Sequence, residues 1–143
     1  MIFLKTPPNF KPRFKVASCY VEFKGKILLL FRNSHKLEGN KWGVPAGKIH
    51  TGESEREAMV REIKEETGLE VSSEKLDYFH KVYVRYPDYD FVYHIFFLKL
   101  DSEPIIKINP REHREHAWVM PQDALNMKLV PDLDGCIKMY YGV

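Results

Sequence analysis

Glutamates in one segment of the chain have a spacing suited to holding a metal ion. Residues 47–69 read GKIHTGESEREAMVREIKEETGL, and most of this segment is predicted to be helical. At about 100° per residue, Glu65 and Glu66 lie within about 60° of Glu62 on the helix surface. Met59 and Ile63 occupy the adjacent arc, which predicts an apolar face that packs on a sheet beside a stripe of carboxylates.

The position of these carboxylates is unfavourable for a helix alone. Glu62 has like charges at i+3 and i+4, and each such pair costs about 0.2–0.5 kcal/mol. Glu65 and Glu66 lie in the last turn, where the helix dipole disfavours an anion by about 0.3–1 kcal/mol. A divalent cation would supply the missing charge, and oxygen ligands without His or Cys suit Mg²⁺ or Mn²⁺. A solvated amphipathic helix is the alternative that the spacing alone leaves open.

Local signals define the elements that would position this helix. Ser54 and Glu57 form a capping box at its start, and Gly68 follows its expected end at Thr67. Further helices are predicted over 121–127 and from Pro131 towards Tyr141.

Apolar runs separated by turn residues predict the strands. Segments 14–23 and 26–31 form a predicted hairpin around Lys24-Gly25, and the run 27–31 is expected to be covered on both faces. Segments 76–86 and 91–100 flank the turn at 87–90. Short extended pieces are expected at 42–46 and 116–120. These elements predict a mixed α/β domain rather than an alternating βαβ series.

Composition narrows the class of protein. The chain has 143 residues, 44% hydrophobic, with 22 basic and 20 acidic side chains and a formal charge of +2. It is predicted to be one domain, 1–143, in which 1–13 form an extended lead-in. The near-balanced charge argues against a nucleic-acid polymer or an anionic membrane as partner. Cys19 and Cys136 are predicted to be buried thiols of a cytoplasmic protein, and the apolar N-terminal stretch is too short for an anchor or signal peptide.

The segment 47–69 resembles the Nudix box, G-x5-E-x7-R-E-U-x-E-E-x-G-U, in which U is a bulky aliphatic residue. All nine fixed positions match: Gly47, Glu53, Arg61, Glu62, Ile63, Glu65, Glu66, Gly68 and Leu69. The preceding residues resemble the W-x-x-P-G-G-K of the MutT-type branch, with Ala46 in place of its middle glycine. Downstream, 112–119 is similar to the family's E-x-x-E-x-x-W-V.

The resemblance implies a Nudix-type α+β fold, a mixed β-sheet sandwiched between α-helices. It also implies hydrolysis of a nucleoside diphosphate linked to another group, with Mg²⁺ or Mn²⁺ as cofactor. Our first choice of substrate is a nucleoside triphosphate, modified or not, cut to monophosphate and pyrophosphate. Alternative substrates are a nucleotide sugar or a dinucleoside polyphosphate, and the position of Tyr86 is a weak match to a tyrosine of family members that act on the latter. A non-catalytic nucleotide-sensing module is the alternative to an enzyme. A homodimer is compatible with the resemblance.

The same resemblance implies roles for individual residues. The expected metal ligands are a carbonyl near Gly47 and the carboxylates of Glu62, Glu65, Glu66 and Glu112. The general base is left open between Glu62 and Glu112, with Glu115 as a competing choice, and Glu66 completes the predicted catalytic set. Arg32 and Lys48 are predicted to bind phosphates, and Glu53 and Arg61 to form a supporting ion pair.

The sequence predicts structural roles for the histidines and for a group of aromatic side chains. The six histidines show no shared metal spacing and are predicted to be surface or packing residues. Tyr83, Tyr86, Tyr89 and Phe91 could stack a base, although ordinary sheet positions are the favoured interpretation.

Overall fold

A mixed sheet of eight strands forms the centre of the protein. The computed structural model describes all residues, 1–143. The strands are β1 (Ile2–Phe3), β2 (Pro12–Phe23), β3 (Lys26–Arg32), β4 (Trp42–Gly43), β5 (Ala46–Lys48), β6 (Asp77–Arg85), β7 (Asp90–Leu100) and β8 (His113–Val119). Their order is β1-β6-β7-β2-β3-β4, with β5 paired to β2 and β8 paired to β3. Only β2 and β7 run parallel among these pairs.

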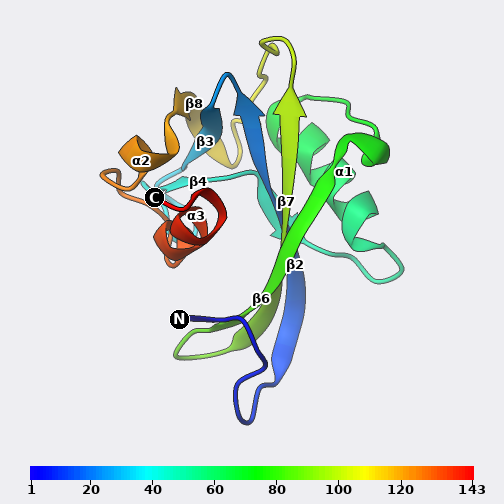
Figure 1. Ribbon diagram of the computed structural model, residues 1–143, viewed down its shortest axis with the longest axis vertical. Helices are drawn as coiled ribbons and strands as arrows, with labels where there is room; N and C mark the ends of the chain where they lie inside the picture. The colour runs from blue at the N-terminus through cyan, green and yellow to red at the C-terminus, as the bar shows by residue number, and fades with distance from the viewer.

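Helices cover both faces of this sheet. They are α1 (Glu55–Thr67), the 3₁₀ turn η1 (Ser73–Lys75), α2 (Pro121–Ala124) and α3 (Leu133–Tyr141). Figure 1 shows α1 on one side of the sheet and α2 and α3 on the other. The predicted α+β sandwich is thereby confirmed. None of the helices is both long and apolar enough to cross a membrane.

Alternating side chains of β3 separate two hydrophobic cores. Ile27 and Leu29 pack into the core that includes residues of α3, whereas Leu28 and Leu30 pack into the core beneath α1. All four side chains are fully buried. The unbroken apolar run is therefore explained by cover on both faces, as the sequence predicts.

The hairpin at Lys24-Gly25 forms, but it is shorter than the sequence predicts. Both turn residues have positive φ (51° and 78°), as the two-residue turn requires. Only Glu22–Ile27 and Phe23–Lys26 pair across it. Beyond them the strands diverge, and the facing edges pair with other strands, β2 with β5 and β3 with β4.

Helix α1 agrees with its local signals residue by residue. Ser54 and Glu57 make both hydrogen bonds of the capping box. Gly68 ends the helix at φ 78°, and its N–H donates to the carbonyl of Lys64 at 2.9 Å. Both cysteines are free and buried, as predicted.

Several element boundaries differ from the sequence-based expectation. The extended lead-in contributes strand β1, which pairs with β6 and extends the sheet. Strand β8 begins at His113, three residues earlier than expected, since this segment pairs with β3 up to Arg32. Helix α3 begins at Leu133 instead of at Pro131, because Asp132 adopts the left-handed conformation (φ 67°) just before it.

Candidate active site

Two carboxylates of α1 lie against the backbone of β5. The N–H of Ala46 donates to Oε2 of Glu66 at 2.9 Å, and the Glu66 residue is only 3% exposed. A methyl group at Gly47 would overlap the carboxylate of Glu62. The glycine at this position is therefore required by close approach of a side chain, since its φ is not positive.

Arg61 connects the acidic residues of this region. Its Nε and Nη2 donate to the two oxygens of Glu53 at 2.6 and 2.9 Å, a bidentate pair. Its Nη1 donates to Oε1 of Glu62 at 2.7 Å and more weakly to Glu65 at 3.3 Å. Nη2 also donates to the carbonyl of Lys48 at 3.0 Å. One guanidinium thus fixes the loop before α1 and orients Glu62.

Burial and mutual repulsion shift the titration of these groups. Burial, followed by the charge of Glu62, raises the pKa of Glu66 well above its usual value. Burial also raises the pKa of Glu62, although the bond from Arg61 opposes the shift. Hydrogen bonds from the Arg61 side chain and the His50 backbone lower the pKa of Glu53 to about 2. The environment therefore disfavours the charge of Glu62 and Glu66 but favours that of Glu53, and a cation bound beside Glu62 and Glu66 would compensate their charge.

The start of β8 brings two more residues to the site. Ligand atoms of Glu66, Glu112 and His113 lie within 4.8 Å of one another. The backbone N–H of Asn33 donates to the carbonyl of Glu112 at 2.9 Å, which ties this segment to the end of β3. The carboxylates of Glu66 and Glu112 lie within 4.8 Å of each other, and the charge of Glu62 acts on Glu66, so these three carboxylates are oxygen donors of the kind that suit Mg²⁺ or Mn²⁺.

His113 lies where sequence reasoning did not place it. Its ring is buried, and one ring nitrogen lies within 4.8 Å of carboxylate oxygens of Glu66 and Glu112, a proximity that the prediction of surface or packing histidines did not include. Burial and the charges of Arg32 and Lys36 lower the pKa of His113 to about 4, which keeps the imidazole neutral at pH 7. The sequence gives the adjacency of His113 to Glu112, but not its proximity to Glu66.

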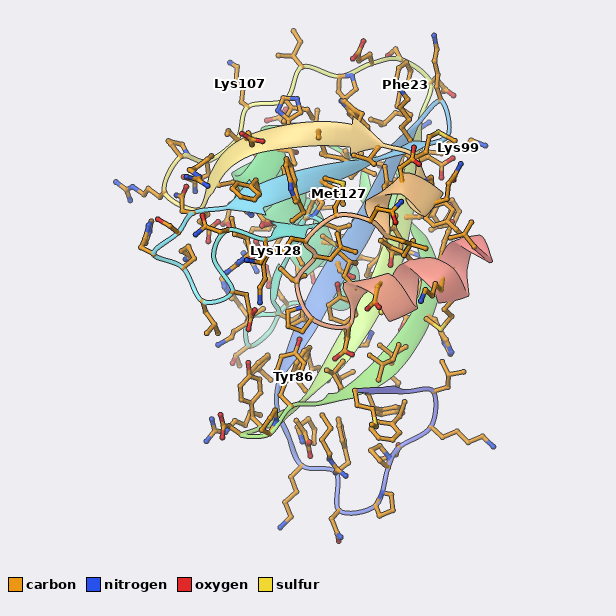
Figure 2. The ribbon with its side chains drawn as sticks, turned by 90° about the vertical axis from the view of Figure 1, so that its left-hand side faces the viewer. Phe23, Tyr86, Lys99, Lys107, Met127 and Lys128 are labelled. Carbon is orange, nitrogen blue, oxygen red and sulfur yellow. The ribbon has the colours of Figure 1, made fainter.

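A pocket adjoins the acidic cluster. Arg32, Glu66 and His113 line part of it, and Tyr86 and Tyr89 line another part together with Phe91 and Tyr93. Its volume of about 200 Å³ corresponds to about six water molecules, enough for a heterocyclic ring. Figure 2 shows Tyr86 at the β6–β7 end of the sheet, below Met127 and Lys128 of the segment between α2 and α3.

The pocket contains acceptor groups away from the acidic cluster. Burial raises the pKa of Tyr86 to about 12, and the charges of Asp132 and Glu38 add to the shift. Both carboxylates also line the pocket. Asp132 already pairs with the N-terminal ammonium and Glu38 with Lys41, so a ligand ring that reaches Tyr86 meets its hydroxyl and two paired carboxylates whose remaining oxygen atoms can accept hydrogen bonds.

Other candidate residues lie outside this pocket. The Nζ of Lys48 is 4.4 Å from the centre of the Phe14 ring, and Lys48 does not line the pocket. The Glu65 side chain is half exposed. Glu115 is exposed on β8 opposite Phe31. Tyr83 packs edge-on against Phe10 instead of joining the other aromatic residues.

The fold thus places an acidic helix beside a pocket that has an aromatic wall. A family model described as the NUDIX domain matches residues 11–140. The chain therefore belongs to the Nudix family, and it is a pyrophosphohydrolase.

Individual relatives are consistent with this family. The CTP pyrophosphohydrolase of Escherichia coli (strain K12) is 29% identical over 129 residues, which cover 82% of this chain and 83% of the relative. The ADP-ribose pyrophosphatase of Methanocaldococcus jannaschii is 47% identical over 49 residues, 34% of this chain and 28% of the relative. The crystal structure of the MutT protein from Methanosarcina mazei Go1 superposes with a TM-score of 0.78 at 24% identity, covering 92% and 95% of the two chains.

Proposed function

We propose that the 143 residues act as one Nudix hydrolase domain that cuts a nucleoside triphosphate to monophosphate and pyrophosphate. The observation that carries this proposal is a single pocket lined by Arg32 and Glu66 as well as by Tyr86, Tyr89 and Phe91. A nucleotide bound there would place its phosphates by the charged residues and its base by the aromatic ones. Similarity to a CTP pyrophosphohydrolase over most of both chains supports a triphosphate.

The acidic cluster supplies the metal site in this proposal. Glu62, Glu66 and Glu112 would hold Mg²⁺ or Mn²⁺, with Glu65 and the carbonyl of Gly47 as further oxygen donors. A bound cation neutralises the anhydride oxygens and lowers the pKa of a water molecule.

Arg32 is the residue that we assign to the phosphates. Its Nε donates to the carbonyl of Leu37 at 3.0 Å, which fixes the direction of the side chain. The structure gives the terminal nitrogens no protein hydrogen bond, so they can donate to a phosphate as a fork. Lys48 is a weaker candidate, because it would have to leave the Phe14 ring to reach the pocket.

Glu112 is the base that the contacts favour. One oxygen of Glu62 accepts from Arg61 at 2.7 Å, whereas Glu112 has only a 3.7 Å ion pair with Lys36. We expect Glu112→Gln to lower kcat by about 10²–10⁴-fold and to remove the acidic limb of the pH–rate profile. Glu62→Gln should lower kcat but retain that limb. The assignment is reversed if only Glu62→Gln removes it.

A screen of nucleotides with product analysis tests the proposed reaction. Because Asp132, Glu38 and Tyr86 offer acceptors, bases with an exocyclic amino group should be preferred. We expect cytosine or adenine triphosphates to have a higher kcat/KM than uridine triphosphate, with pyrophosphate as product and no turnover in EDTA. Release of orthophosphate from triphosphates contradicts the proposal. Turnover only of bridged dinucleotides or nucleotide sugars favours those substrates instead.

A further inference from the structure

The ring of His113 is buried beside the acidic cluster, and one of its nitrogens has no hydrogen-bond partner. The residue is 3% exposed, and its Nδ1 is buried without a hydrogen-bond partner. A ring nitrogen of the same residue is within 4.8 Å of carboxylate oxygens of Glu66 and Glu112. Buried polar atoms are normally satisfied, so an unpartnered one at a cluster of ligand atoms indicates that something binds there.

The backbone around His113 is fixed by hydrogen bonds from two directions. The His113 N–H donates to the carbonyl of Asn109 at 2.9 Å. The side-chain amide of Asn33 donates to the carbonyl of Pro110 at 2.8 Å, and its backbone N–H donates to the carbonyl of Glu112. His113 also pairs in register with Arg32 of β3. The backbone that carries the ring is therefore held in a defined place and does not belong to a loose loop.

We propose that His113 contributes a nitrogen ligand to the metal centre, so that this position favours a transition-metal ion such as Mn²⁺ or Co²⁺ over Mg²⁺. This inference rests on the proposed metal-dependent function and adds to it the choice of ion. Carboxylates alone suit Mg²⁺, Ca²⁺ and Mn²⁺, whereas imidazole nitrogen binds transition metals and has little affinity for Mg²⁺. Affinity for nitrogen-containing sites also rises from Mn²⁺ to Co²⁺.

A hydrogen bond between His113 and a substrate phosphate is the competing role. In that case the ring would affect nucleotide binding, but it would not distinguish between metal ions when no nucleotide is present. The decisive experiment therefore starts from the metal-free protein, to which one kind of metal ion is added in the absence of substrate.

Electron spin echo spectroscopy of bound Mn²⁺ reads the ligand directly. We expect the unmodified protein to show the nitrogen coupling of a coordinated imidazole, and His113→Ala to lose it. His116→Ala is the matched control, since this histidine is exposed on the same strand, and it should retain the coupling. Absence of nitrogen coupling in the unmodified protein overturns the proposal, even where a variant fails to fold.

Calorimetric titration of the same proteins with Co²⁺ and Mg²⁺ gives a second measurement. We expect His113→Ala to weaken Co²⁺ binding by about tenfold or more and Mg²⁺ binding by less than about twofold. Equal losses for both ions, or no loss for Co²⁺, contradict nitrogen ligation. His113→Gln provides a polar replacement of similar reach if the alanine variant unfolds.

Hydrolysis of nucleoside triphosphates is assayed separately, with Mg²⁺ and with Mn²⁺. Failure of that assay with both ions while the nitrogen coupling is present would refute the proposed substrate and leave the ligand assignment intact. Turnover of triphosphates by a protein that shows no nitrogen coupling would refute the ligand assignment and leave the proposed substrate intact.

Discussion

Replacement of Glu66 by glutamine is expected to lower kcat by about 10³-fold and to make the metal-free protein more stable. The carboxylate is buried, and its only hydrogen bond comes from Ala46. Glutamine has nearly the same shape and retains an oxygen for that bond. It removes the negative charge, whose proposed role is to bind the cation. Loss of one preorganised electrostatic group of this kind lowers kcat by about 10²–10³-fold or more.

The pH dependence of stability separates this effect from misfolding. The pKa of Glu66 is raised in the folded protein, so its protonated form favours folding. Its contribution is fully present below the pKa of the unfolded chain, near 4.5, and is lost as the pH rises through the folded pKa. The metal-free protein should therefore lose thermal stability as the pH rises above about 4.5, and Glu66→Gln should flatten this dependence.

Thermal unfolding with and without Mn²⁺ checks the prediction. Added Mn²⁺ should stabilise the unmodified protein most at high pH and should have little effect on Glu66→Gln. Glu70→Gln is the control, because this residue is exposed and pairs only with Lys64 at the surface. A glutamine variant at 66 with full activity, or with an unchanged response to Mn²⁺, would remove Glu66 from the metal site.

The elements that sequence predicted well are those specified by neighbours in the chain. The capping box at Ser54 and Glu57 and the glycine at 68 determine the ends of α1 through hydrogen bonds that span at most four residues. The turn at Lys24-Gly25 is likewise local. The Nudix box adds the identity of the acidic residues, because all its fixed positions lie within one segment.

The features that sequence could not supply depend on residues far apart in the chain. Parallel pairing of β2 with β7 joins segments about 75 residues apart, and no local pattern indicates it. His113 was missed for the same reason, since Glu66 approaches it only through the folded sheet. The pocket similarly combines the end of β3, the β6–β7 turn and the start of α3. Tyr86, Tyr89 and Phe91 line it, although alternation alone favoured ordinary sheet positions.

Replacement of Arg61 by alanine is the second change with a large expected effect. The guanidinium bonds to Glu53, Glu62 and the carbonyl of Lys48. Without it, Glu62 remains nearly buried, with its charge uncompensated, against Gly47. We expect the free energy of unfolding to fall by about 2–3 kcal/mol, because an unpaired buried charge is left behind.

Activity should fall with stability, although Arg61 does not line the pocket. Residues that orient metal ligands typically affect metal affinity or activity by about 10–100-fold, and a loss in this range is expected. Arg61→Lys should recover only part of it, since one ammonium group cannot reproduce the bidentate contact with Glu53 while also bonding to Glu62.

Urea denaturation of the metal-free proteins measures the stability change, with Lys64→Ala as the control on the same helix. Lys64 makes one exposed ion pair, so its removal should cost no more than about 1 kcal/mol.

The depressed pKa of Glu53 gives a further test. Stability from its pair with Arg61 is present above about pH 4.5 and lost as the pH falls towards 2, and Arg61→Ala should abolish that acid dependence. If Arg61→Ala and Lys64→Ala unfold alike, the network around Arg61 does not hold the site together, and the orientation of Glu62 must come from its packing against β5 alone.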